Sequence, residues 1–105
     1  MNQEINERLK KISERLKKEY QAEKVILYGS YAKGQSTRDS DVDLFIVAPT
    51  KERFYERMAS VLCLLRDLYQ GIPFSPIVLT PAELKKRVDI GDQFINEILT
   101  KGISL

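Results

Sequence analysis

Two short apolar runs on either side of a polar segment constrain the fold more than any other feature of this sequence. The runs cover residues 24–28 (KVILY) and 42–48 (VDLFIVA). Both are rich in β-branched and aromatic side chains, which favour strands. The segment between them, residues 29–41 (GSYAKGQSTRDSD), is polar and contains glycine, which is typical of a loop with room for one helical turn. The sequence therefore predicts two mostly buried strands joined by an irregular segment.

Amphipathic helices are predicted on both sides of these strands. Apolar residues recur at helical spacing over residues 2–20, which predicts a first helix. A second helix is predicted over residues 51–70, with Thr50 as its N-cap residue and Gly71 after its end. Its expected buried face consists of Phe54, Met58, Val61, Leu62, Leu65, Leu68 and Tyr69, extended by Cys63 and Leu64.

The C-terminal part predicts one more strand and two short helices. Residues 77–79 (IVL) form the strand, and Pro73 and Pro76 before it indicate an edge position or a late start, because proline cannot donate a ladder hydrogen bond. Thr80, followed by Pro81 and Glu83, is a capping-box signature for a helix that ends near residue 88. Asp92 can cap a last helix. We expect that helix to bury Phe94, Ile95, Ile98 and Leu99.

The length and the order of these elements define the expected architecture. A chain of 105 residues normally builds one hydrophobic core, so we expect a single domain over residues 1–105. The order helix, strand, strand, helix, strand, helix, helix predicts a small α/β or α+β layer fold with a three-stranded sheet and helices packed on it.

Composition excludes several classes of function. The sequence has no histidine and one cysteine, which excludes Cys/His zinc sites and His-dependent triads and leaves oxygen ligands for Mg²⁺, Mn²⁺ or Ca²⁺. A net charge of +2 and a pI near 8.7 are too small for a dedicated nucleic-acid binder, so we expect no direct nucleic-acid partner.

The apolar runs are far shorter than the ~20 residues that cross a bilayer, and the N-terminal residues carry no signal-peptide pattern. We therefore expect a cytoplasmic protein with no membrane partner.

The two ends of the polar segment carry the residues best suited to chemistry. Gly29 ends the first strand and lets another group approach the backbone, and Ser30 offers a hydroxyl and an N–H as a seat for phosphate oxygens. Asp41 and Asp43 are two residues apart at the start of a strand, so both carboxylates should project to one face and form a hard-oxygen site for Mg²⁺. Taken alone, Gly-Ser is usually a turn and Asp-x-Asp a solvated capping motif. The combined spacing Gly-Ser-x10-Asp-x-Asp between two strands favours the chemical interpretation.

The stretch VILYGSYAKGQSTRDSDVDLFIV resembles the signature of the DNA polymerase β-like nucleotidyltransferase superfamily, and in particular its minimal nucleotidyltransferases. The resemblance implies a nucleotidyltransferase fold with a small mixed sheet. It also implies transfer of a nucleotide, usually AMP from ATP, to a hydroxyl group. Asp41 and Asp43 would act as catalytic residues that hold Mg²⁺, and Gly29 and Ser30 would contact the triphosphate.

The same resemblance implies a partner protein. Gly-Ser-x10-Asp-x-Asp resembles the motif of minimal nucleotidyltransferases that act as antitoxins in toxin–antitoxin pairs. Such antitoxins are encoded beside all-helical HEPN-domain RNase toxins and silence them by adenylylation. We therefore expect a HEPN-type toxin as the acceptor. The sequence leaves the oligomeric state open, including a homo-oligomer.

One position departs from the superfamily pattern. The superfamily usually supplies a third carboxylate from the next strand, at a position that corresponds to Ser75 or Pro76 in this sequence. The third acid is then dispensable, supplied from elsewhere (Glu83, Asp89 and Asp92 follow), or lost with the activity. The alternatives to the enzyme are an antitoxin that acts by contact alone, and a nucleotide-binding or RNA-sensing module. Lys33 and Arg38 in the loop either contact phosphate or remain solvated.

Overall fold

The part of the chain described by the computed structural model, residues 3–37 and 39–105, folds into four helices and four strands. Arg38, expected either to contact phosphate or to remain solvated, lies outside these residues. Along the chain the elements are α1 (Gln3–Glu19), β1 (Lys24–Tyr28), β2 (Val42–Val47), α2 (Phe54–Leu65), β3 (Phe74–Leu79), α3 (Pro81–Asp89), α4 (Gln93–Lys101) and β4 (Ile103–Ser104).

The strands form one mixed sheet in the order β3-β2-β1-β4. β1 runs antiparallel to β2 and to β4, whereas β3 runs parallel to β2. The edge position of the third strand is confirmed. The alternative of a late start is wrong, because β3 begins at Phe74 and includes Pro76. The expected number of three strands is wrong by one. β4 is only two residues long and both are exposed, so it leaves no periodic pattern in the sequence.

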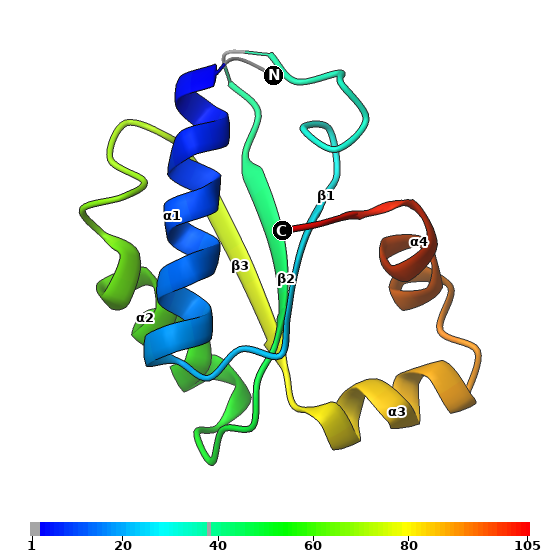
Figure 1. Cartoon of the computed structure of the whole chain (residues 1–105). Coiled ribbons are helices and arrows are strands. Elements are labelled where there is room, and N and C mark those ends of the chain that lie inside the picture. The colour runs from blue at the N-terminus through cyan, green and yellow to red at the C-terminus, as the bar shows by residue number, and fades with distance from the viewer. Residues whose placement is uncertain (1–2, 38) are drawn as a thin grey trace.

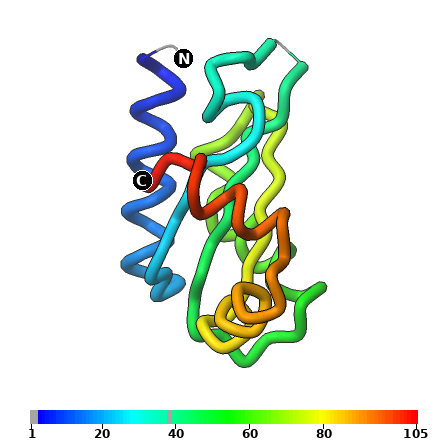
Figure 2. The backbone as a smooth tube through the Cα atoms, turned by 90° about the vertical axis from the view of Figure 1, so that its right-hand side faces the viewer, coloured from blue at the N-terminus to red at the C-terminus, as the bar shows by residue number. Residues whose placement is uncertain are grey.

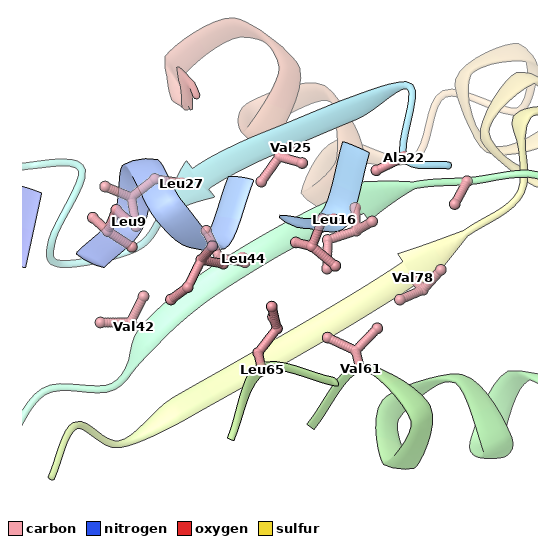
Figure 3. Packing of buried hydrophobic residues seen from close by; sticks show 13 residues of the cluster. Leu9, Leu16, Ala22, Val25, Leu27, Val42, Leu44, Val61, Leu65 and Val78 are labelled. Atoms are coloured by element: carbon pink, nitrogen blue, oxygen red, sulfur yellow. The ribbon is translucent and has the colours of Figure 1, made fainter. Parts of the chain in front are cut away.

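Alternating side chains divide the sheet into two faces, each covered by two helices (Figure 1). The larger core lies between the sheet and α1 and α2, where side chains from both helices and from β1, β2 and β3 point toward one another (Figure 3). The smaller core lies on the opposite face, against α3 and α4. Its buried members are Ile26, Phe45, Val47, Leu79, Ile95 and Ile98. The α/β layer architecture is therefore confirmed.

The second helix is shorter than the sequence predicts, and its N-cap residue is different. α2 begins at Phe54 with Arg53 as N-cap, not Thr50, and it ends at Leu65 rather than near residue 70. The Thr50 hydroxyl accepts a hydrogen bond from the Glu52 backbone N–H instead. The Glu52 carboxylate in turn accepts hydrogen bonds from Tyr20 and Ser60, and these contacts keep the residues before Arg53 out of the helix.

Several apolar residues predicted to be buried are exposed. Val61 and Leu65 are fully buried, but in the first turns of α2 the buried side chain is Arg57, which donates to the Val78 carbonyl of β3. Phe54 is 59% exposed and Met58 45% exposed. Cys63 is exposed as well, so the prediction that it extends the buried face of α2 is wrong. On α4, Ile95 and Ile98 are buried as predicted, whereas Phe94 and Leu99 are exposed because α4 packs on the sheet through one narrow stripe.

The remaining helix predictions agree with the structure. α1 buries Leu9, Ile12 and Leu16 on one stripe. Thr80 caps α3 in the expected capping box with Glu83, and the Asp92 carboxylate accepts from the Ile95 backbone N–H at the start of α4. Among the described residues, none of the helices combines the length and the apolar character that crossing a membrane requires.

Candidate functional site

The carboxylates predicted to act together lie on the α3/α4 face of the sheet, at one end of β2. Asp43 is the second residue of β2, and it pairs with Tyr28 of β1 on one side and with Ser75 of β3 on the other. Asp41 precedes the strand by one residue, and its Oδ2 atom lies 3.4 Å from the Ser75 hydroxyl. Three neighbouring strands thus align Tyr28, Asp43 and Ser75 in one row, and Asp41 lies beside Ser75.

The Asp43 carboxylate lies close against the backbone of Gly29. The residue has φ +76°, a conformation that strongly favours glycine. A Cβ atom built on Gly29 would collide with Asp43 Oδ2. The absence of a side chain at Gly29 therefore lets the carboxylate lie against the backbone where β1 ends.

The negative charges of Asp41 and Asp43 affect the pKa values at this site. Burial raises the pKa of Asp43 above its ordinary value, and the nearby charge of Asp41 raises it further. Burial and the charge of Asp43 together raise the pKa of Tyr28 to about 12. A cation between the two carboxylates would relieve this repulsion.

The segment that follows Gly29 forms the helical turn allowed by the sequence. The Lys33 backbone N–H donates to the Gly29 carbonyl at 3.2 Å, and the Gln35 N–H donates to the Ser30 carbonyl at 2.9 Å. The first N–H groups of such a turn find no acceptor within it and can bind anion oxygens. Ser30 begins this turn, next to Gly29, so the structure brings the predicted phosphate-binding residues to the carboxylate pair.

The donor set suits a hard divalent cation that keeps open positions. Asp41 and Asp43 supply carboxylate oxygens and Ser75 a hydroxyl, which is the oxygen chemistry that Mg²⁺ prefers. Within residues 3–37 and 39–105, no group of three or more His, Cys, Asp or Glu side chains could hold a metal. Water and substrate oxygens would therefore complete the coordination.

The sheet register decides which residue occupies the position of the third carboxylate. Ser75 is aligned with Asp43, whereas Pro76 is aligned with Leu44, whose side chain is buried on the α1/α2 face. Ser75 therefore faces the carboxylates and Pro76 does not.

The three acids that follow β3 have other partners. Glu83 forms an ion pair with Arg57 at 2.6 Å. Asp89 pairs with Lys85, and Asp92 caps α4 and pairs with Arg87.

A pocket beside the carboxylates was not predicted from the sequence. It has a volume of about 220 Å³ and lies between the turn after β1 and α4. Tyr28 and Gly29 line it from the sheet, and Phe94 and Glu97 line it from the helix. Lys33, expected to contact phosphate or to remain solvated, pairs with Glu97 at 3.6 Å. The exposure of Phe94 is the feature that sequence reasoning missed, because helical periodicity assigned this residue to the core.

The sheet is mixed and carries helices on both faces, and an Asp-x-Asp strand lies beside a Gly-Ser turn. This combination defines a nucleotidyltransferase-type domain. Residues 9–102 match the nucleotidyltransferase domain family, and the chain belongs to that family. A crystal structure of a candidate nucleotidyltransferase from Sulfolobus solfataricus has a similar fold, with a TM-score of 0.59 and 22% sequence identity. The match covers 96% of this chain and 80% of that chain.

Three proteins of Methanocaldococcus jannaschii, named as candidate protein adenylyltransferases, are similar in sequence. The first is 42% identical over 43 residues (41% of this chain, 43% of the relative), and the second is 38% identical over 63 residues (57% and 43%). The third is 36% identical over 56 residues (50% and 65%). The chain therefore spans less than two thirds of the length of these relatives.

Proposed function

We propose that the chain is a Mg²⁺-dependent, cytoplasmic nucleotidyltransferase that transfers AMP from ATP to a hydroxyl group of a partner protein. The observation that carries the proposal is the contact between the Asp43 carboxylate and Gly29, with Asp41 beside it. It joins a cation-binding pair to a phosphate-binding turn. The names of the three archaeal relatives support adenylyl transfer to protein as the reaction.

In this reaction the acceptor oxygen forms a bond to the α-phosphorus of ATP, and the bond from that phosphorus to the pyrophosphate oxygen breaks. Pyrophosphate leaves, and the hydroxyl proton passes to solvent because Ser75 provides no base. Asp41 and Asp43 would hold the cation, and the turn at Gly29 and Ser30 would orient the triphosphate. When bound, Mg²⁺ would neutralise charge that builds up on the leaving pyrophosphate.

The partner we propose is a HEPN-type RNase toxin, with this chain as its antitoxin. The proposal rests on the resemblance of Gly-Ser-x10-Asp-x-Asp to the motif of such antitoxins. The test is to incubate the purified protein with labelled ATP, Mg²⁺ and the helical protein encoded by the neighbouring gene. We expect label in the helical protein and loss of its RNase activity, both abolished by EDTA and by the double variant Asp41→Asn, Asp43→Asn.

A second function, inhibition of the toxin by contact alone, is favoured by Ser75 at the position of the third carboxylate. In that case the double variant inhibits the RNase as well as the wild type does, and no label is transferred. The circular dichroism of the double variant controls for folding, because both replaced carboxylates lie at the sheet surface. Absence of both labelling and inhibition contradicts the antitoxin role.

A further inference from the structure

The pocket between the turn after β1 and α4 adjoins the carboxylates but takes no part in the chemistry described so far. Figure 2 shows the C-terminal helix crossing in front of the strands, close to that turn. Gly29 belongs to both sites, because it lines the pocket and contacts the Asp43 carboxylate. A molecule bound at the carboxylates can therefore extend directly into the pocket.

The size of the pocket limits what it can hold. Sites for whole small-molecule ligands usually measure roughly 300–1,000 Å³, and this one measures about 220 Å³. It has room for one planar ring system, while the rest of a nucleotide would remain outside, at the turn and the carboxylates.

The walls of the pocket suit an aromatic ring. The rings of Tyr28 and Phe94 meet edge to face, with centroids 5.8 Å apart. Phe94 is nevertheless 52% exposed, so part of its ring surface has no protein covering. Ala32 and Ile98 add apolar surface from the turn and from α4. Heterocyclic bases stack on such aromatic side chains in proteins.

The polar rim of the pocket carries one acid. The Glu97 carboxylate is an acceptor without a hydrogen to donate when ionised. It favours an exocyclic amino group and repels a carbonyl oxygen at the same place. Its ion pair with Lys33 joins two side chains that are each about half exposed, a kind of pair that contributes little stability. A base can therefore replace Lys33 as the partner of Glu97.

We propose that this pocket holds the base of the nucleoside triphosphate and that Glu97 selects adenine and cytosine, which carry an exocyclic amino group where guanine and uracil carry a carbonyl oxygen. Phe94 supplies the stacking surface, and Lys33, once released from Glu97, neutralises a phosphate. The inference rests on the proposed function, since it assigns the base-binding part of that same site.

The test measures binding of ATP, CTP, GTP and UTP by calorimetry, with Mg²⁺ and no acceptor protein. We expect ATP and CTP to bind more tightly than GTP and UTP, and Glu97→Gln to remove most of this preference, because an amide both donates and accepts. Loss of base stacking in Phe94→Ala should weaken all four nucleotides roughly tenfold. Ile90→Ala is the matched control, since Ile90 is an exposed apolar residue outside the pocket, and we expect it to bind like the wild type.

Magnesium tripolyphosphate, which has no base, separates this inference from the proposed function. Suppose that tripolyphosphate competes with ATP while the four nucleotides bind equally well. The pocket inference is then wrong and the phosphate site stands. A Phe94→Ala variant that binds like Ile90→Ala, or a preference that survives Glu97→Gln, also overturns the inference. Failure of both tripolyphosphate and the nucleotides to bind overturns the inference and the proposed function together.

Discussion

Gly29 and Gly34 adopt the same kind of backbone conformation, with φ values of +76° and +70°, but only one of them has a close neighbour. A Cβ atom at Gly34 would meet nothing within 4 Å, whereas one at Gly29 would collide with the Asp43 carboxylate. The residue types alone do not reveal this difference, because both glycines lie in the same short turn.

We predict that Gly29→Ala and Gly34→Ala lose similar stability but differ in activity. Each variant places a Cβ in a left-handed conformation, which costs about 1–2 kcal/mol. At Gly29 the colliding atom is the end of a side chain, so Asp43 can rotate away, and nucleotidyl transfer should then be lost. Urea unfolding and AMP incorporation measure the two effects. Transfer by Gly29→Ala at the rate of Gly34→Ala would show that the approach of Asp43 to Gly29 is not needed.

At Ser75 the structure makes the missing carboxylate testable. General-base assistance is typically worth ~10²–10⁴ in rate, and Ser75 faces the carboxylate pair. We therefore predict that Ser75→Asp raises AMP transfer by about that range and that Ser75→Asn, similar in size but uncharged, does not. Pro76→Asp is a poor comparison, because it would bury a charge against the α1/α2 core. If Ser75→Asp leaves a fast wild-type rate unchanged, two carboxylates suffice.

Among the elements, the sequence predicted most accurately those whose ends are set by local chemistry. The bounds of β1 agree with the run KVILY, and the caps at Thr80 and Asp92 are where short-range hydrogen bonding places them. The start of α2 was predicted too early because it depends on the contacts of Glu52 with Tyr20 and Ser60. Tyr20 is distant in sequence, so no local pattern contains this information.

Much of the candidate site was predictable, since the Gly-Ser turn and Asp-x-Asp lie within one continuous stretch flanked by strands. The contribution of α4 to the site was not predictable from the sequence. Its approach to the turn after β1 depends on tertiary packing, and the apolar pattern of α4 placed Phe94 in the core. The position of Ser75 relative to Asp43 likewise depends on strand register, which a sequence with prolines on both sides of Ser75 leaves open.

The caps provide a direct test of the corrected helix start. The Thr80 hydroxyl accepts from the Glu83 N–H at the start of α3, whereas Thr50 caps no helix. We predict that Thr80→Ala costs about 1 kcal/mol of unfolding free energy, as is typical for loss of an N-cap, and that Thr50→Ala costs clearly less. Chemical denaturation of both variants measures the difference. Equal losses would indicate that Thr50 does stabilise the start of α2.

The ion pair between α2 and α3 should make stability depend on acid pH. The hydrogen bond from Arg57 holds the pKa of Glu83 below its ordinary value. The stabilisation by Glu83 is therefore fully present above the unfolded pKa, about 4.3, and is lost as pH falls through the folded pKa. We predict that Glu83→Gln lowers the melting temperature at neutral pH. The difference in melting temperature between the variant and the wild type should become smaller in acid. A constant gap from pH 7 to strongly acidic pH would contradict this assignment.

For the molecule as a whole, ligand binding should stabilise the fold only when metal and nucleotide are present together. Two carboxylates leave most Mg²⁺ positions to water, so the affinity for Mg²⁺ alone should be weak until phosphate oxygens complete the shell. Any ligand that binds only the folded state raises the melting temperature by mass action. We predict a clear rise with Mg²⁺ and ATP together and almost none with Mg²⁺ alone. Calorimetry that detects tight Mg²⁺ binding without nucleotide would contradict this.

The proline within β3 has a consequence for how the molecule behaves at high concentration. β3 is an outer strand of the sheet, and Pro76 pairs with Leu44 of β2 without an N–H to donate. The carbonyls of Pro73 and Leu79 bond to the β2 side, so by alternation the nitrogen of Pro76 faces the outer rim and interrupts the row of backbone donors there. A strand from another molecule that approached this rim would lose a hydrogen bond in the middle of its ladder. Edge-to-edge polymerisation into extended sheets is thereby disfavoured along β3 in a crowded solution.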